Sequence, residues 1–196
     1  MAAHYLHHLS SAPVREAQAR YHGRAAAVPP AGLDRLGEDE TAFIRERDSF
    51  YLATISPTGW PYIQHRGGEA GFLRVLNPSR LAFADYRGNR QLLSTGHVAA
   101  EARVSLFLMD YPQRIRLKVL GRATVLDARE HPGQVAAIAG SDWGPRTERL
   151  FLIDVVSFDW NCPQYITPRF TALEVEATVT GLRTRITELE AALVAR

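Results

Sequence analysis

Three short segments of the chain combine basic, amide and glycine residues, a composition that favours binding of an anionic ligand. The first runs from Gln64 through His65 and Arg66 to Gly67 and Gly68, at the end of a run of β-forming residues. Glycine lets a flat ligand approach the backbone closely, and an arginine can bind a phosphate oxygen or a ring edge. His65 is a candidate general base, but no Asp or Ser partner is visible near it, so the alternative is an ordinary packing histidine.

The second segment, Asp85 to Gln91, follows a predicted strand and reads Asp-Tyr-Arg-Gly-Asn-Arg-Gln. We predict a helix over Gly88–Thr95, with Asn89 as its N-cap and Gly96 at its end. The free N–H groups at a helix start bind anions, so together with Arg90 they predict a phosphate cradle. The alternative is a capped helix with a surface arginine.

The third segment carries Arg114, Arg116 and Lys118 at alternate positions of a strand predicted over Arg114–Asp127. Alternate residues of a strand share a face, so the three cations would lie side by side. On a solvated edge their repulsion costs little, whereas on a barrel strand flanked by apolar runs an anionic partner explains them better. Lys118 is the only lysine among 23 basic residues. Either it marks a position suited to a compact ammonium, or the arginine bias reflects genome composition.

The composition excludes several functional classes. A net charge of +2 without a dense basic stripe argues against a nucleic-acid partner. The longest apolar runs, such as Val104–Met109, are far shorter than the roughly 20 residues of a membrane span, and no signal peptide is visible. The single cysteine, Cys162, has no activating partner and fits a reducing compartment, so we expect a cytoplasmic protein. The scattered histidines predict no metal site.

Runs of β-branched and aromatic residues between turn residues predict the elements that position these segments. We expect strands over Phe50–Ser56, Trp60–Arg66, Phe72–Leu76, Arg80–Ala84, Arg103–Met109, Arg114–Asp127 and Leu150–Trp160. Helices are expected over Ser11–Arg24, Asp34–Arg47, Gly88–Thr95 and His131–Ala139. Many short hairpins with few helices predict a mainly β (α+β) fold built on an antiparallel barrel.

The C-terminal stretch from Leu173 to Arg196 has a helical pattern of its own. Its apolar residues are spaced 4, 3, 4, 3 and 4 apart, which is a heptad seam; they are Val175, Val179, Leu182, Ile186, Leu189 and Leu193. Arg185 and Glu190 occupy positions where an ion pair can form between two helices. The helix would either form a coiled coil in a dimer or pack on its own barrel.

Four blocks of the sequence, in this order, resemble the pyridoxamine 5′-phosphate oxidase family of FMN-binding split barrels. They are FYLATISPTGWPYIQHRGG, LAFADYRGNRQLLSTG, RVSLFLMDYPQRIRLKVLGRA and FDWNCPQYITPRF, and the resemblance runs from about Phe43 to Phe170. It implies an antiparallel split β-barrel with flanking helices and a C-terminal helix, a homodimer, and FMN in a site shared between subunits. The expected division is an N-terminal helical or irregular extension (1–40), the FMN-binding domain (41–171) and the C-terminal amphipathic helix (172–196).

The resemblance also implies roles for individual residues. Gln64 to Gly67 match the segment along the flavin ring and ribityl chain, and Arg90 and Gln91 match an Arg-Lys pair on the FMN phosphate. Arg116 matches a flavin-contacting glutamine supplied by the second subunit, and Lys118 would replace the charge missing at Gln91. Trp160 and Arg169 match C-terminal flavin contacts. With Asp85 and Asn89, the candidate cofactor-binding residues are Gln64, His65, Arg66, Gly67, Asp85, Asn89, Arg90, Gln91, Arg116, Lys118, Trp160 and Arg169.

Two departures from the family pattern concern the substrate. Glu69 stands where the oxidase has a lysine for its substrate phosphate, and Tyr165–Arg169 replaces an RLHDR segment of which only the last arginine remains. A carboxylate near a phosphate dianion opposes binding. We therefore expect the flavin site to be kept and the vitamin B6 phosphate site to be lost.

The leading hypothesis is a flavin oxidoreductase in which FMN exchanges hydride at N5 with an unidentified small-molecule substrate or redox partner. Arg66, Arg116 and Lys118 would stabilise the reduced anionic flavin, and no catalytic residue is assigned. One alternative is a non-catalytic FMN carrier or sensor. Another is the same fold with deazaflavin F420 or with haem, for which His65 or His97 would be the axial ligand. A dimer that binds no cofactor is the simplest alternative.

Overall fold

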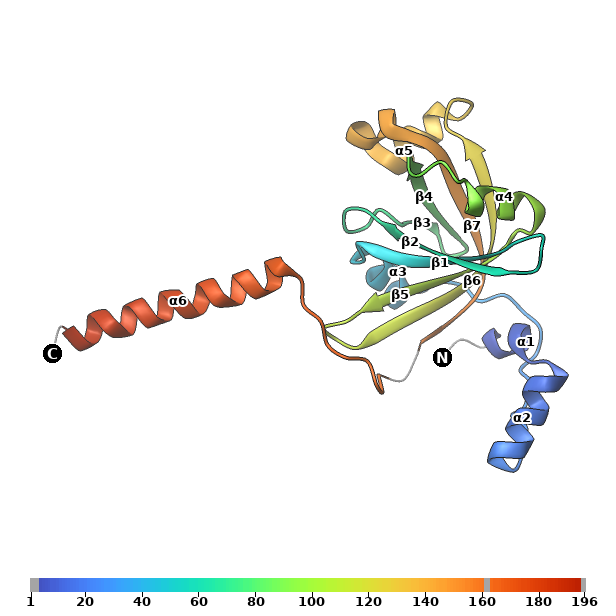
Figure 1. Ribbon diagram of the computed structural model, residues 1–196, viewed down its shortest axis with the longest axis horizontal. Coiled ribbons are helices and arrows are strands. Elements are labelled where there is room, and N and C mark those ends of the chain that lie inside the picture. The colour runs from blue at the N-terminus through green and yellow to red at the C-terminus, as the bar shows by residue number, and fades with distance from the viewer. Residues whose placement is uncertain (1–3, 161–162, 195–196) are drawn as a thin grey trace. The chain divides into compact units, whose positions relative to one another are not determined.

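The computed structural model describes residues 4–160 and 163–194, so Cys162 lies outside the described residues. Seven strands form one sheet in the order β2-β1-β5-β6-β7-β4-β3, and their pairings are antiparallel (Figure 1). The strands are β1 (Ser49–Ile55), β2 (Pro61–Gly67), β3 (Arg74–Asn77), β4 (Arg80–Tyr86), β5 (Arg103–Asp110), β6 (Ile115–Asp127) and β7 (Thr147–Trp160). The predicted antiparallel α+β fold is thereby confirmed.

Within the described residues, short helices precede or connect these strands and one longer helix follows them. They are α1 (Tyr5–Leu9), α2 (Ala12–His22), α3 (Glu38–Arg45), α4 (Leu93–Ala100), α5 (Pro132–Trp143) and α6 (Ala172–Val194), with a 3-10 turn η1 (Gly144–Arg146). α3 packs on β3, α4 on β1, and α5 on β4 and β7. None of the helices in the described ranges has the length and apolar character to cross a membrane.

The strands follow from a period-two alternation of apolar and polar side chains. In β1, Phe50, Leu52 and Thr54 are buried while Tyr51 and Ile55 are exposed. The pairing of β6 with β7 shifts its register between Leu120 and Gly121. A Cβ at Gly121 would lie 2.5 Å from Ile153 Cγ2, so only glycine lets the two backbones approach this closely.

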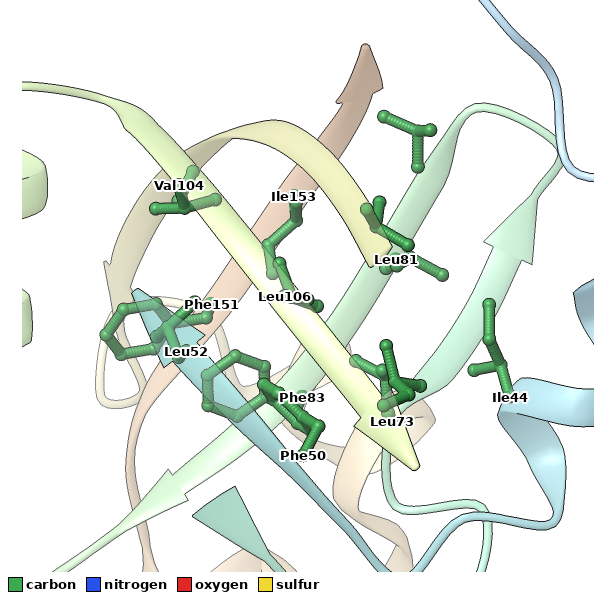
Figure 2. Packing of buried hydrophobic residues seen from close by; sticks show 14 of the residues in the cluster. Ile44, Phe50, Leu52, Leu73, Leu81, Phe83, Val104, Leu106, Phe151 and Ile153 are labelled. Atoms are coloured by element: carbon green, nitrogen blue, oxygen red, sulfur yellow. The ribbon is translucent and has the colours of Figure 1, made fainter. Parts of the chain in front are cut away.

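The core lies inside a sheet that curls on itself. Phe83 of β4 stacks on Phe151 of β7 with ring centroids 4.8 Å apart, and Phe50 of β1 meets Phe83 edge-to-face at 5.3 Å. Figure 2 shows these rings with Leu52, Leu106 and Ile153 in one cluster. Since β1 and β4 are far apart in strand order, the cluster fills a split barrel and not one face of a flat sheet.

Two predicted elements beside the candidate site differ from the structure. The helix predicted over Gly88–Thr95 begins at Leu93 and ends at Ala100, so Gly96 lies within it. The strand predicted from Arg114 begins at Ile115, because Arg114 has a left-handed φ of 59° and lies in the preceding turn. Only Arg116 and Lys118 therefore share the predicted cationic face. Residues Tyr5–Leu9 form a helix that was not predicted.

The chain forms two compact units, one from the described residues of 1–109 and 116–162 and one from those of 110–115 and 163–196. The first contains the barrel core and helices α1 to α5. The second contains α6. The predicted division at residues 40 and 171 is a functional one and stays a prediction.

Candidate functional site

A small cavity lies where β2, the end of β4 and the start of α4 meet. Its lining brings together six of the twelve predicted residues, namely Gln64, Arg66, Asp85, Asn89, Arg90 and Gln91, with Tyr62, Tyr86, Gly88, Leu92, Leu93, Ser94, Thr95 and Arg149. Its volume is about 50 Å³. Sites for whole small molecules are roughly 300–1,000 Å³, so this cavity holds at most one end of a larger ligand.

A buried carboxylate between two arginines forms one wall of this cavity. Asp85 is 6% exposed. It accepts a short hydrogen bond from Arg66 Nη1, and its Oδ2 lies 2.8 Å from Arg149 Nε. Asp85 and Arg149 are direct partners in the β4–β7 ladder. The carboxylate therefore holds both guanidinium groups in place.

One donor of Arg66 has no acceptor in the part of the chain that the structure describes. Its guanidinium lies 5.4 Å from the centre of the Phe151 ring and 5.6 Å from that of Phe83. Its Nε is buried and has no hydrogen-bond partner among the described residues. An unpaired buried donor is costly, so an acceptor from outside the chain would stabilise Arg66.

The loop before α4 has a shape that the sequence did not predict. Asn89 Oδ1 accepts a hydrogen bond from the Gln91 N–H at 3.1 Å, so Asn89 caps a local turn and the prediction that it caps the helix is wrong. Arg90 and Leu92 have left-handed φ values of 60° and 53°. These conformations delay the helix to Leu93. The free N–H groups at the start of α4 therefore belong to residues after Gln91.

One hydrogen bond ties the first turn of α4 to β2. Ser94 is buried, and its hydroxyl donates to Gln64 Oε1 at 2.9 Å. The bond fixes the Gln64 amide beside the cavity and closes one side of it. Gln64 and Arg66 share a face of β2, and His65 lies on the other.

Five predicted residues of the first unit lie outside the cavity lining. His65 contacts the Tyr51 ring at 5.6 Å, and the Arg116 guanidinium lies 5.7 Å from the Phe107 ring. Lys118 Nζ lies 2.6 Å from Asp159 Oδ2. Trp160 donates its indole N–H to Glu40 at 2.6 Å. Gly67, the fifth, lines a neighbouring cavity.

Arg169, the last predicted cofactor contact, and His97, a haem candidate, also lie outside the cavity lining. Arg169 belongs to the second unit, where its guanidinium lies 5.1 Å from the Tyr111 ring. His97, one of the two axial haem candidates, has its Nδ1 3.0 Å from Thr54 Oγ1. Across residues 4–160 and 163–194, the structure shows no group of three or more His, Cys, Asp or Glu side chains able to hold a metal ion.

The neighbouring cavity, about 220 Å³ in volume, carries Glu69 at its edge together with Gly67, Arg74 and Tyr86. Tyr86 lines both cavities. Burial raises the pKa of the Tyr86 phenol above its usual value; the charge of Glu69 adds to the increase, while that of Arg74 opposes it. Tyr86 therefore remains a neutral hydrogen-bonding group between the cavities at neutral pH.

Sequence reasoning missed several lining residues. Arg149 precedes a predicted strand without any local motif, and only the β4–β7 register places it beside Asp85. Tyr62 alternates with Gln64 and Arg66, so the face of β2 could have identified it. Ser94 and Thr95 were inside the predicted helix, and its true start would have placed them in the first turn.

Comparisons with known proteins point to one family and one fold. The family model described as pyridoxamine 5′-phosphate oxidase matches residues 36–160. No curated protein sequence matches the chain significantly.

Solved structures support the fold at low identity. A Lactobacillus delbrueckii protein, provisionally named a pyridoxamine 5′-phosphate oxidase, is 19% identical over 64% of this chain and 93% of its own, with a TM-score of 0.50. HupZ of Group A Streptococcus is 11% identical over 69% of this chain and 99% of its own, and a conserved protein of Mycobacterium tuberculosis is 15% identical over 73% and 96%, both with TM-scores of 0.50.

Proposed function

The chain belongs to the pyridoxamine 5′-phosphate oxidase family, and on this basis we propose that it is an FMN-dependent oxidoreductase whose cavity at the start of α4 holds the FMN phosphate. FMN supplies hydride transfer at its N5 atom when it is bound. The proposal includes a homodimer that shares the site. The substrate or redox partner is a small molecule other than pyridoxamine phosphate.

The excess of positive charge in the cavity is the observation that carries this proposal. Its lining contains three arginines and one aspartate, and Glu148 pairs with Arg149 at 3.1 Å, so these five groups carry a net charge of +1. The start of α4 adds N–H groups and the positive end of the helix dipole. A volume of about 50 Å³ suits a phosphate-sized group, and the larger remainder of FMN would lie outside the cavity.

The residues of the chain have separate tasks in this proposal. Arg90 is exposed at the mouth and binds the phosphate as a charged donor. Arg66 offers its unpaired Nε to the ligand, while Asp85 fixes the rest of its guanidinium. Gln64 is oriented by Ser94 and presents its amide nitrogen toward the ligand.

The dimer is proposed to complete the site with residues outside the cavity lining. Arg116 is the candidate that the resemblance places in the second subunit, and Trp160 and Arg169 are the C-terminal flavin contacts that it implies. Lys118 is a weaker candidate for replacing the missing charge at Gln91, because Asp159 already balances its ammonium at 2.6 Å.

The charge of Glu69 supports a substrate without a phosphate group. Glu69 lies at the second cavity, which shares Tyr86 with the first. Its charge already acts on the Tyr86 phenol. A phosphate dianion at this edge would face a carboxylate, so a neutral or cationic substrate fits better.

Comparing FMN with riboflavin tests the phosphate site directly, since the two differ only in the phosphate. We expect FMN to bind at least roughly tenfold tighter, because a charged hydrogen bond contributes about 1.5–3 kcal/mol. Gln91→Lys adds one charge to the lining and should tighten FMN binding while leaving riboflavin unchanged. Equal affinity for both flavins in all variants would contradict the proposed phosphate site.

A turnover assay separates the enzyme from a carrier. The FMN-loaded protein is mixed with reductants and candidate oxidants, and the flavin absorbance is followed. Repeated reduction and reoxidation with a substrate supports the oxidoreductase. Tight FMN binding without turnover under any pairing would instead support the carrier or sensor.

A further inference from the structure

Helix α6 carries an inference that is independent of the flavin site. We propose that α6 pairs with α6 of a second copy of this chain as a parallel, in-register, two-stranded coiled coil. Figure 1 shows α6 as one long uninterrupted helix. The heptad spacing, the residue types at the seam and the charges beside it together specify the partner and its direction.

No other described part of its own unit covers the apolar seam of α6. No residue of this 23-residue helix is buried. Val175, Leu182, Ile186, Leu189 and Leu193 of the seam are 48–70% exposed. A helix held only by its own hydrogen bonds would not tolerate such a stripe in water, so a second apolar surface is required.

Gly181 and four threonines weaken the middle of α6, although alanine, glutamate and arginine at its other outer positions favour a helix. The hydroxyls of Thr178, Thr184 and Thr187 donate to the carbonyl four residues earlier at 3.0–3.1 Å, a bond that slightly weakens helices. Packing of the seam would therefore add stability where the middle of the helix is weakest.

The residues at the seam favour two parallel strands. The spacing places Val179, Ile186 and Leu193 at the a positions and Val175, Leu182 and Leu189 at the d positions. A β-branched residue at two of the three a positions with leucine at two of the three d positions is the combination that favours a parallel dimer. The partner that matches this pattern residue for residue is another copy of α6.

The flanking charges select the same direction. In a parallel pair, Arg185 at a g position lies beside Glu190 at the following e position of the other helix, and the symmetric pair forms as well. In a single chain Arg185 contacts Glu188 at 2.9 Å on an exposed surface, so it can change partner at little cost.

An antiparallel pair would place like charges together. Matching the six seam residues in that direction sets Val175 opposite Leu193. The e positions then bring Glu176 beside Glu190 and Arg183 beside Arg183, and the g positions bring Arg185 beside Arg185. Like charges at these positions are destabilising, so the charge pattern favours the parallel direction.

A disulfide between two copies tests both the partner and its direction. Cys162 is first replaced by serine, and Val175→Cys is added in the full-length chain. In the parallel pair the two introduced thiols face each other within disulfide reach. In the antiparallel pair they lie about 27 Å apart along the axis, from 18 residues at a rise of about 1.5 Å. We expect mild oxidation to convert most chains to a reducible dimer.

Ala177→Cys is the matched control, because it lies on the outer face of the same helical turn and should remain monomeric under denaturing, non-reducing conditions. When a mass-tagged Leu193→Cys chain is mixed with the Val175→Cys chain, no disulfide should join the two different chains. Such a product would be recognised by a mass between those of the two like dimers. Such a mixed disulfide, or equal cross-linking of the two positions 175 and 177, would overturn the proposal.

Charge exchange gives a second readout. Arg185→Glu should reduce cross-linking through Val175→Cys roughly fivefold, and adding Glu190→Arg should restore it. Failure of this rescue would refute the proposed ion pair. If FMN still binds while position 175 does not cross-link, the coiled coil fails and the proposed function stands.

Discussion

Arg90→Ala is the substitution that isolates the phosphate site most cleanly. Arg90 lies at the mouth of the cavity, and its side chain is exposed. Its backbone has a left-handed φ of 60°, which alanine tolerates no better than arginine. The substitution therefore removes a guanidinium without relaxing the loop, and a change in FMN affinity reports the lost interaction.

The magnitude follows from the exposure of the side chain. A hydrogen bond to a charged group contributes about 1.5–3 kcal/mol. Because Arg90 is solvated and screened by salt, the lower end applies, and about 1.5 kcal/mol corresponds to a roughly tenfold increase in Kd. Arg66 and Arg149 keep their places beside Asp85, so binding is weakened and not abolished.

Quenching of FMN fluorescence measures the Kd at low and high salt. Arg87→Ala is the matched control, since Arg87 is an exposed arginine of the same segment outside the cavity lining. We expect Arg90→Ala alone to weaken binding and to reduce the salt dependence. Unchanged affinity in Arg90→Ala, or an equal loss in Arg87→Ala, would refute the reasoning.

Three further predictions follow from the site and the core. Asp85→Asn leaves the poorly exposed guanidinium of Arg66 without a carboxylate, while Arg149 keeps Glu148 at 3.1 Å. It should lower the free energy of unfolding by about 3 kcal/mol, measured by urea denaturation; an unchanged midpoint would contradict the buried ion pair. Phe83→Ala removes the ring that stacks on Phe151 at 4.8 Å and should cost about 3–5 kcal/mol in the same assay, whereas a loss below 1 kcal/mol would argue against the core of Figure 2. Burial, with the charge of Glu69, raises the pKa of the Tyr86 phenol in the folded state. The neutral phenol therefore contributes its full stability below the unfolded pKa of about 10. That contribution is lost as the pH rises through the higher folded pKa. Unfolding measured between neutral and alkaline pH should show a smaller alkaline decline in Tyr86→Phe, and identical profiles would contradict this.

The sheet was predictable because its signals are local. Each strand alternates or carries a continuous apolar run, and residues such as Pro57 and Gly59 mark the turn between β1 and β2. These patterns set the number of strands and their order along the chain. They do not set the pairing of β4 with β7, which joins residues more than sixty positions apart.

The site was predictable only in part for the same reason. Gln64, Arg66 and Arg90 belong to segments whose composition already favours an anion. Arg149 depends on register, and the start of α4 depends on left-handed backbone at Arg90 and Leu92. Non-glycine residues adopt that conformation only when their surroundings impose it, so no local propensity could have shown it.

An absorbance spectrum of the purified protein, followed by mass identification of the released ligand, tests the central claim most directly. We predict the spectrum of an oxidised flavin and release of FMN. A colourless protein that also fails to take up added FMN would contradict the proposed cofactor site.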